Sequence, residues 1–113
     1  MSSHYKLENL VSAYGDAVQN GDPEAVARLF TEDAILLPPN RPEFRGRQAI
    51  QDFYSSIMTG GWREDVNIQD IQDDGETVFA TGTYDTGEFA GTWLKVLKVQ
   101  SDDTLLIHRW CWN

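Results

Sequence analysis

The first half of the chain carries apolar residues at the spacing of helices. One apolar face repeats at intervals of three and four positions and comprises Leu7, Leu10, Val11, Tyr14, Ala17 and Val18. Ser2 or Ser3 would cap this helix, and Gly21 would end it because glycine tolerates a left-handed backbone. We therefore predict an amphipathic helix between these two ends.

A short helix and a short strand follow. Residues 22–24 combine an aspartate cap, a proline suited to the first turn and a glutamate that complements the helix dipole. The residues that this second helix turns inward are Val26, Leu29 and Phe30. The apolar run 34–37 has the length of a strand, and Pro38 and Pro39 close it.

A third helix is predicted to begin near Gly46 and to stop at Gly60 and Gly61. Its apolar face comprises Ala49, Ile50, Phe53, Tyr54, Ile57 and Met58. The helices of this chain are therefore grouped ahead of residue 62.

After Trp62 the hydrophobic pattern changes to a period of two, which is typical of strands. It predicts strands over 66–71, 77–85, 89–100 and 105–113. Asp74 and Gly75 are a signal for a two-residue hairpin turn, and residues 85–87 are a second turn. Helices ahead of a meander of strands predict an α+β fold, in which about three helices pack on the concave face of a cone-shaped, mixed or antiparallel sheet.

Length and charge narrow the class of protein. A chain of 113 residues predicts a single domain over 1–113. Its 18 acidic and 9 basic side chains give a net charge of −9, which disfavours nucleic acid, and no run is apolar enough to cross a membrane. The lone Cys111 favours the cytoplasm, and with only His4 and His108 as histidines we expect neither a metal nor a cofactor.

Three segments carry a resemblance to a known superfamily. Residues 14–34 (YGDAVQNGDPEAVARLFTEDA), residues 44–54 (FRGRQAIQDFY) and the closing segment 93–113 resemble the nuclear-transport-factor-like proteins. Within that superfamily the chain is similar to SnoaL-like and ketosteroid-isomerase-like domains. The resemblance covers nearly the whole chain and implies a cystatin-like cone, a fold that hosts isomerases, dehydratases, cyclases and binding modules.

The resemblance also locates positions of catalytic interest. In ketosteroid isomerases an aspartate base works beside an oxyanion hole made of a tyrosine and a protonated acid. The oxyanion tyrosine falls on Tyr14 and its supporting tyrosine on Tyr54, whereas the base position holds Pro38 and the acid falls near Lys95. Since the general base is lacking, the resemblance does not imply steroid isomerisation.

Alternation along the last predicted strand divides its residues between two faces. One face would hold His108, Trp110 and Trp112, and the other Ile107, Arg109 and Cys111. By the resemblance, the first set lines the cone together with Trp93, Lys95, Leu97 and Val99. We expect the cone to bind a small, largely apolar molecule, with acid–base chemistry by Tyr14 and His108. The predicted ligand-binding residues are Tyr14, Phe53, Tyr54, Trp93, Lys95, His108, Trp110 and Trp112.

Each of these assignments has a structural alternative. Trp110 and Trp112 would fill the cone if they pack as core, and Tyr14 and His108 would then be buried residues with satisfied hydrogen bonds. The chain would in that case be a non-catalytic oligomerisation or interaction module. In both cases alternation leaves apolar residues on the outer sheet face, which predicts a homodimer, as in related domains. These residues are Leu94, Val96, Ile107 and Cys111.

Overall fold

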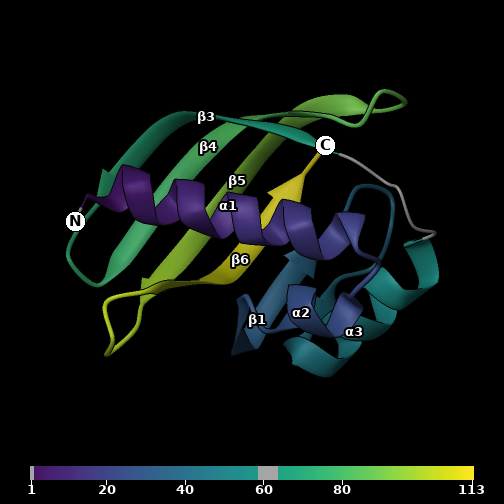
Figure 1. The fold of residues 1–113 in the computed structure, drawn as a ribbon, viewed down its shortest axis with the longest axis horizontal. Helices are drawn as coiled ribbons and strands as arrows, with labels where there is room; N and C mark the ends of the chain where they lie inside the picture. Colours follow the sequence, from purple (N-terminus) through teal and green to yellow (C-terminus); the bar gives the residue numbers. More distant parts are fainter. Residues whose placement is uncertain (1, 59–63) are drawn as a thin grey trace.

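The computed structural model describes residues 2–58 and 64–113, and in them three helices accompany a six-stranded mixed sheet (Figure 1). The helices are α1 (Ser3–Gln19), α2 (Pro23–Ala27) and α3 (Gly46–Ile57). The strands are β1 (Phe30–Leu37), β2 (Phe44–Arg45), β3 (Asp65–Asp73), β4 (Thr77–Asp85), β5 (Ala90–Val99) and β6 (Leu105–Trp112). The predicted α+β class is confirmed.

The strands lie in the order β2-β1-β6-β5-β4-β3. β1 runs parallel to β6, and the other neighbours are antiparallel. Figure 1 shows α1 lying across the sheet and α2 and α3 gathered beside β1. The apolar face of α1 packs into the core against the inward side chains of β5 and β6. Among the described residues, none of the helices has the length and hydropathy needed to span a membrane.

The helix starts follow the predicted capping chemistry. The backbone N–H of Tyr5 donates to Ser2 Oγ at 3.2 Å, so Ser2 is the cap of α1. The N–H of Ala25 donates to Asp22 Oδ1 at 3.0 Å, and Pro23 occupies the first turn of α2. Gly21 adopts a positive φ of 65° directly after α1, as its position predicted.

Strand β1 begins earlier than its apolar run suggested. Phe30 was expected on the second helix, but α2 ends at Ala27 and Phe30 is the first residue of β1. Phe30 pairs with Ile107, and the Ile107 N–H donates to the Leu29 carbonyl at 2.8 Å. Pairing with a strand nearly eighty residues away therefore overrides the local helical pattern, which cannot report such contacts.

Two smaller expectations also change. The loop between β3 and β4 has three residues, Asp74, Gly75 and Glu76, because the last pair of the ladder is Asp73 with Val78 and β4 starts at Thr77. The two-residue strand β2 was not predicted, since so short a segment carries no period. The predicted helix end at Gly60 and Gly61 lies outside the described residues.

A β-bulge in β6 reverses the predicted faces of two residues. Arg109 pairs with Val96 and Ile107 pairs with Leu97, so β6 uses one more residue than β5 in this interval, and that residue is His108. The bulge shifts the alternation, and Ile107 is fully buried in the core. The predictions that Ile107 faces outward and that His108 lines the cone are therefore wrong.

Gly82 makes room for a tryptophan on the neighbouring strand. Gly82 of β4 pairs with Trp93 of β5, and the indole N–H of Trp93 donates to the Thr83 carbonyl at 3.0 Å. A Cβ atom at position 82 would overlap the Asn67 carbonyl oxygen and lie 2.5 Å from the Trp93 ring. The inward position of Trp93 thus depends on the missing side chain of Gly82.

We predict that Gly82→Ala displaces Trp93 and lowers the free energy of unfolding by about 1–3 kcal/mol, the usual cost of overpacking. Denaturant melts followed by tryptophan fluorescence measure the change. Gly15→Ala is the control, because a Cβ at Gly15 of α1 meets open space and alanine stabilises a helix by about 0.5–1 kcal/mol relative to glycine. Equal stability of Gly82→Ala and the wild type would contradict the assignment.

Candidate functional site

Lys95 lies in the interior of the sheet, among aromatic rings. It is the central inward residue of β5, between its partners Ala80 and Trp110, and only 1% of it is exposed. Its Nζ lies 4.1 Å from the ring centroid of Trp110, 4.4 Å from that of Trp93 and 5.9 Å from that of Tyr14. The ring faces carry negative charge density and therefore stabilise the ammonium group in place of water.

Two tyrosines from different helices meet beside this lysine. The hydroxyl oxygens of Tyr14 on α1 and Tyr54 on α3 are 3.0 Å apart, so one donates a hydrogen bond to the other. The Tyr14 hydroxyl also donates to Glu64 Oε2 at 3.5 Å, a long hydrogen bond. Burial raises the pKa of both tyrosines, so both are neutral donors near neutral pH.

Glu64 is the carboxylate of the site, and the sequence analysis missed it. It directly precedes β3, where no hydrophobic period singles out one acidic residue among the 18 of the chain. Desolvation raises the pKa of Glu64, while the positive charge of Lys95 and the hydrogen bond from Tyr14 lower it. Burial thus outweighs the two interactions that favour the charged carboxylate.

Lys95 and Glu64 influence each other's protonation. Burial lowers the pKa of Lys95 to about 8, although the negative charge of Glu64 favours the protonated amine. The Glu64 charge also contributes, after burial, to the raised pKa of Tyr84, whose hydroxyl donates to the Asn113 carbonyl at 2.6 Å. The charge of this one carboxylate therefore influences the pKa of four neighbouring groups, which are Tyr14, Tyr54, Tyr84 and Lys95. We call this cluster the cone site and define it as Tyr14, Tyr54, Glu64, Trp93, Lys95 and Trp110.

Trp110 forms the inner wall of the cone site. It is 3% exposed, with ring centroids 5.1 Å from Tyr14, 6.1 Å from Phe30 and 5.2 Å from Trp112. Among the described residues, its Nε1 is the one buried side-chain N or O atom without a hydrogen-bond partner. A buried N–H without an acceptor lowers the free energy of unfolding. This N–H is therefore a free donor, directed at no protein group that the structure describes.

The predicted ligand-binding residues divide into three groups. Tyr14, Tyr54, Trp93, Lys95 and Trp110 lie together in the cone site, and half-buried Trp112 adjoins it through Trp110. Phe53 adjoins the cone site on another side, with its ring centroid 5.3 Å from that of Tyr54. Its ring packs against Phe44 at 4.7 Å and lies 5.5 Å from the Arg41 guanidinium.

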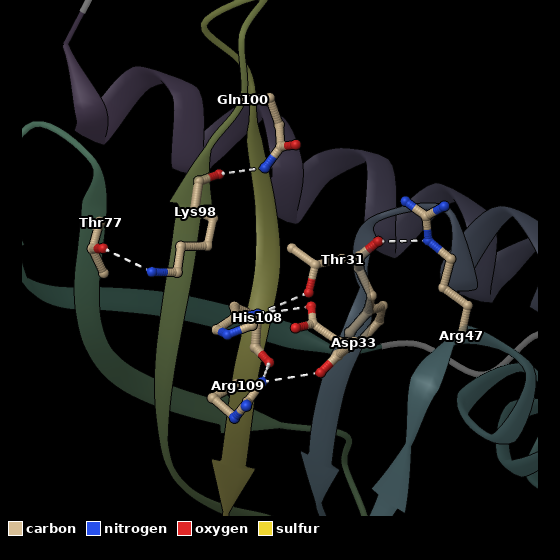
Figure 2. A network of polar contacts seen from close by, with 9 residues as sticks. Thr31, Asp33, Arg47, Thr77, Lys98, Gln100, His108 and Arg109 are labelled. Atoms are coloured by element: carbon tan, nitrogen blue, oxygen red, sulfur yellow. Dashed lines mark hydrogen bonds and ion pairs between the residues drawn. The ribbon is translucent and has the colours of Figure 1, made fainter.

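His108 lies on the outer face of the sheet, turned away from α1 (Figure 2). Its Nδ1 is 2.9 Å from Thr31 Oγ1 and 3.6 Å from Asp33 Oδ1, and Arg109 donates to the Asp33 carbonyl at 3.2 Å. Burial and the charge of Arg109 lower the pKa of His108, while Asp33 opposes the shift. The expected pairing of His108 with Tyr14 in one site is therefore wrong, because the bulge in β6 separates them.

Two of the pockets that the described residues form lie away from the cone site. One, of about 390 Å³, lies between α1 and β3 and is lined by His4, Glu8, Val11, Ser12, Val66, Asn67 and Ile68. The other, of about 460 Å³, lies between α1 and the β5–β6 turn and includes Lys6, Leu10, Leu29 and Leu105. In the same part of the chain, no cluster of three His, Cys, Asp or Glu residues could hold a metal ion.

The half-exposed residues of this region mark its accessible end. β3 begins just after Glu64, β6 ends at Trp112, and the ladder pairs Trp112 with Trp93 and Tyr84 with Val66. These residues therefore share one end of the sheet, and both Glu64 and Trp112 are half-buried there. Lys95 lies two positions further in along β5.

Comparison with known proteins identifies the sequence family. The profile of the SnoaL-like domain matches residues 11–104. A steroid Δ-isomerase of Nocardioides simplex is 44% identical over 53 residues, which are 46% of this chain and 43% of the relative. The match thus spans less than half of that enzyme's length.

Solved structures share the fold at low sequence identity. An NTF-2 like protein of unknown function from Shewanella oneidensis has a TM-score of 0.83 at 15% identity, with 98% of each chain covered. A ketosteroid isomerase-like protein from Erwinia carotovora has a TM-score of 0.73 at 21% identity and covers 93% of this chain and 90% of its own. A Nostoc punctiforme domain with a cystatin-like fold has a TM-score of 0.82 at 15% identity. The alignment covers 100% of this chain and 78% of that domain. The cystatin-like cone is therefore confirmed as the fold.

We predict that the stability of the wild type rises with pH relative to Lys95→Met between about pH 8 and pH 10. The lysine pKa is about 8 in the folded state against an ordinary 10.5, so in this window the unfolded chain binds more protons and folding gains with rising pH. The full shift corresponds to a gain on the order of 3 kcal/mol. Urea melts at several pH values measure it.

Lys98→Met is the matched control, because Lys98 is three positions further along β5 and half-buried on the outer face. If Lys98→Met altered the pH dependence of stability as much as Lys95→Met does, burial of Lys95 would not be the source of that pH dependence.

Proposed function

The chain belongs to the SnoaL-like domain family, and from this premise we propose that the cone site binds a small, largely apolar carbonyl compound and moves a proton on it. One observation carries the proposal: the Tyr14 hydroxyl lies between the Tyr54 hydroxyl and the Glu64 carboxylate, beside the buried Lys95. A base, a neutral hydrogen-bond donor and a cation are thus brought to one apolar place. Such a combination suits proton abstraction next to a carbonyl group.

The roles follow from the charges. Glu64 takes the proton from the carbon next to the carbonyl, and the electron pair of that C–H bond moves toward the carbonyl oxygen. The Tyr14 hydroxyl, itself supported by Tyr54, donates a hydrogen bond to the oxygen as negative charge develops on it. The raised pKa of Glu64 strengthens it as a base, because its affinity for the transferred proton increases.

Ligands smaller than a steroid suit this site. Pro38 is buried directly after β1 and accepts no proton, and by the resemblance it falls on the position of the base in the ketosteroid isomerases. Trp110 fills the inner part of the cone with its packed ring. The proposal therefore takes Glu64 as the base and does not include steroid isomerisation, which is the activity named for the Nocardioides relative.

We predict that the wild type exchanges the α-protons of cyclohexanone with D2O and that Glu64→Gln slows this exchange by about 100-fold or more, the usual contribution of a general base. Tyr14→Phe also slows the exchange, because it removes the hydrogen bond to the oxygen on which negative charge develops. Proton NMR of the ketone follows the reaction, and circular dichroism checks that each variant folds. Glu76→Gln, in the β3–β4 turn, is the control; equal rates for it and Glu64→Gln would remove Glu64 as the base.

A second candidate function is supported by the outer sheet face. Phe79 is 42% exposed and Leu94 is 43% exposed, and both lie on this face near half-buried Val96 and Cys111. Exposed apolar residues grouped on a sheet are typical of a surface that another protein covers. The chain would then associate through this face, and in the interaction-module alternative the packed Trp110 would leave the cone without a ligand.

We predict a homodimer through the outer face, with a light-scattering mass near twice 12.8 kDa at micromolar concentration. Leu94→Lys would return the mass to 12.8 kDa, because it places a charge in the covered apolar surface. Phe89→Lys is the control, since Phe89 is 64% exposed but lies in the β4–β5 turn. A wild-type mass of 12.8 kDa would show that the exposed face is not used for pairing.

A further inference from the structure

We propose that Lys95 captures the carbonyl ligand of the cone site as an imine, through a covalent bond between Nζ and the carbonyl carbon. The inference rests on the proposed function and names the chemical class of the ligand: an aldehyde or ketone whose carbonyl carbon is unhindered. It assigns Lys95 a role as nucleophile, beyond that of a cation that stabilises Glu64.

The position of the amine supports this role. Lys95 is held between Ala80 and Trp110 in the middle of the sheet, and its Nζ lies 4.1 Å and 4.4 Å from the ring centroids of Trp110 and Trp93. Three aromatic rings exclude water from the amine, and an imine survives longer where water is scarce. The two half-buried residues at the near end of the sheet, Glu64 and Trp112, mark the side from which a small ligand reaches it.

The amine is also in a suitable protonation state. An ammonium group has no free electron pair, so only the neutral amine attacks a carbonyl carbon. Burial lowers the pKa of Lys95 to about 8, whereas 10.5 is its ordinary value, so a much larger fraction is neutral near pH 7.5 than for a lysine in water. The lowered pKa supports the argument from position, because the contacts of Lys95 alone already place its amine in the cone site.

The neighbouring groups can supply and accept the protons that imine formation requires. Lys95 Nζ bonds to the carbonyl carbon while the C=O electron pair moves to oxygen, and a proton passes from nitrogen to that oxygen to give a carbinolamine. A second proton, delivered by protonated Glu64 through the Tyr14 hydroxyl, lets the oxygen leave as water while the C=N bond forms. The resulting protonated imine and the Glu64 carboxylate balance the charges, and one water is released.

Trp110 carries an unused hydrogen-bond donor in the wall of the same site. Its buried Nε1 has no hydrogen-bond partner among the described residues, and Lys95 Nζ lies over the ring of the same residue. The N–H lies in the plane of the ring, so it is available to a ligand oxygen that reaches this edge of the indole. The imine also deepens the proposed function, because a protonated imine withdraws electrons from the neighbouring carbon more strongly than a neutral carbonyl does, which assists proton removal by Glu64.

Reductive trapping tests the inference on the intact chain. Cyclohexanone and sodium cyanoborohydride at pH 7.5 reduce any imine to a stable secondary amine, and peptide mass mapping locates the added cyclohexyl group. The chain has three lysines, Lys6, Lys95 and Lys98, and an α-amino group, so the surface amines serve as internal controls. We expect Lys95 to be labelled at least about tenfold faster than Lys98, as for an activated amine nucleophile.

Variants separate the amine from its charge. Lys95→Arg keeps the positive charge and should lose the label, whereas Lys98→Arg should keep it. Because the wild-type map already compares the lysines, the test stands even if Lys95→Arg does not fold. Labelling of Lys95 no faster than Lys98 overturns the imine.

The two proposals fail in different ways. If Lys95 is not labelled but the wild type still exchanges the α-protons of cyclohexanone through Glu64, the imine is wrong and the proposed proton transfer stands. If neither labelling nor exchange occurs, both are wrong for this ketone class, and the cone site is a structural cluster of polar groups. Preferential labelling of Lys95 together with exchange that depends on Glu64 supports both.

Discussion

Removing the Lys95 ammonium from water is the constraint around which the inner face of the sheet is arranged. An ammonium group loses several kcal/mol of hydration on burial unless other groups replace the water. Here the faces of Trp93 and Trp110 and the charge of Glu64 replace it. Trp93 reaches its position only because Gly82 has no side chain. Burial of Lys95 therefore also requires a glycine on the next strand, β4.

The sheet separates two surfaces of different chemistry. Its inner face holds the cone site, with a buried cation, a carboxylate and two hydroxyl groups, whereas its outer face combines exposed apolar residues with the polar contacts of His108 (Figure 2). The two proposed functions therefore use opposite faces of the sheet.

The sequence predicted those features that depend on local chemistry. The Asp22 cap was predicted, and the cap of α1 was narrowed to Ser2 or Ser3, because such side chains bond to nearby backbone groups. The bounds of β4 agree because its alternation is regular. The resemblance indicated which face of β5 lines the cone, and regular alternation then placed Trp93, Lys95 and Leu97 on it, since β5 has no extra residue.

Features that depend on distant parts of the chain were not accessible in the same way. Phe30 joins a strand because β6 lies beside it, and Glu64 enters the site because the start of β3 lies beside Tyr14 of α1. The face of His108 was mistaken because a bulge is defined by the partner strand, and alternation within β6 alone cannot reveal it.

The bulge at His108 also affects how the length of this strand can vary. Because His108 is the additional residue opposite β5, a chain without it would pair Arg109 and Ile107 with the same partners and keep Trp110 and Trp112 facing inward. Loss of a residue elsewhere in β6 would instead turn one set of these side chains to the opposite face. An alignment gap between relatives is thus tolerated at this one position of β6, and an alignment that places it a few residues away would exchange inner for outer residues.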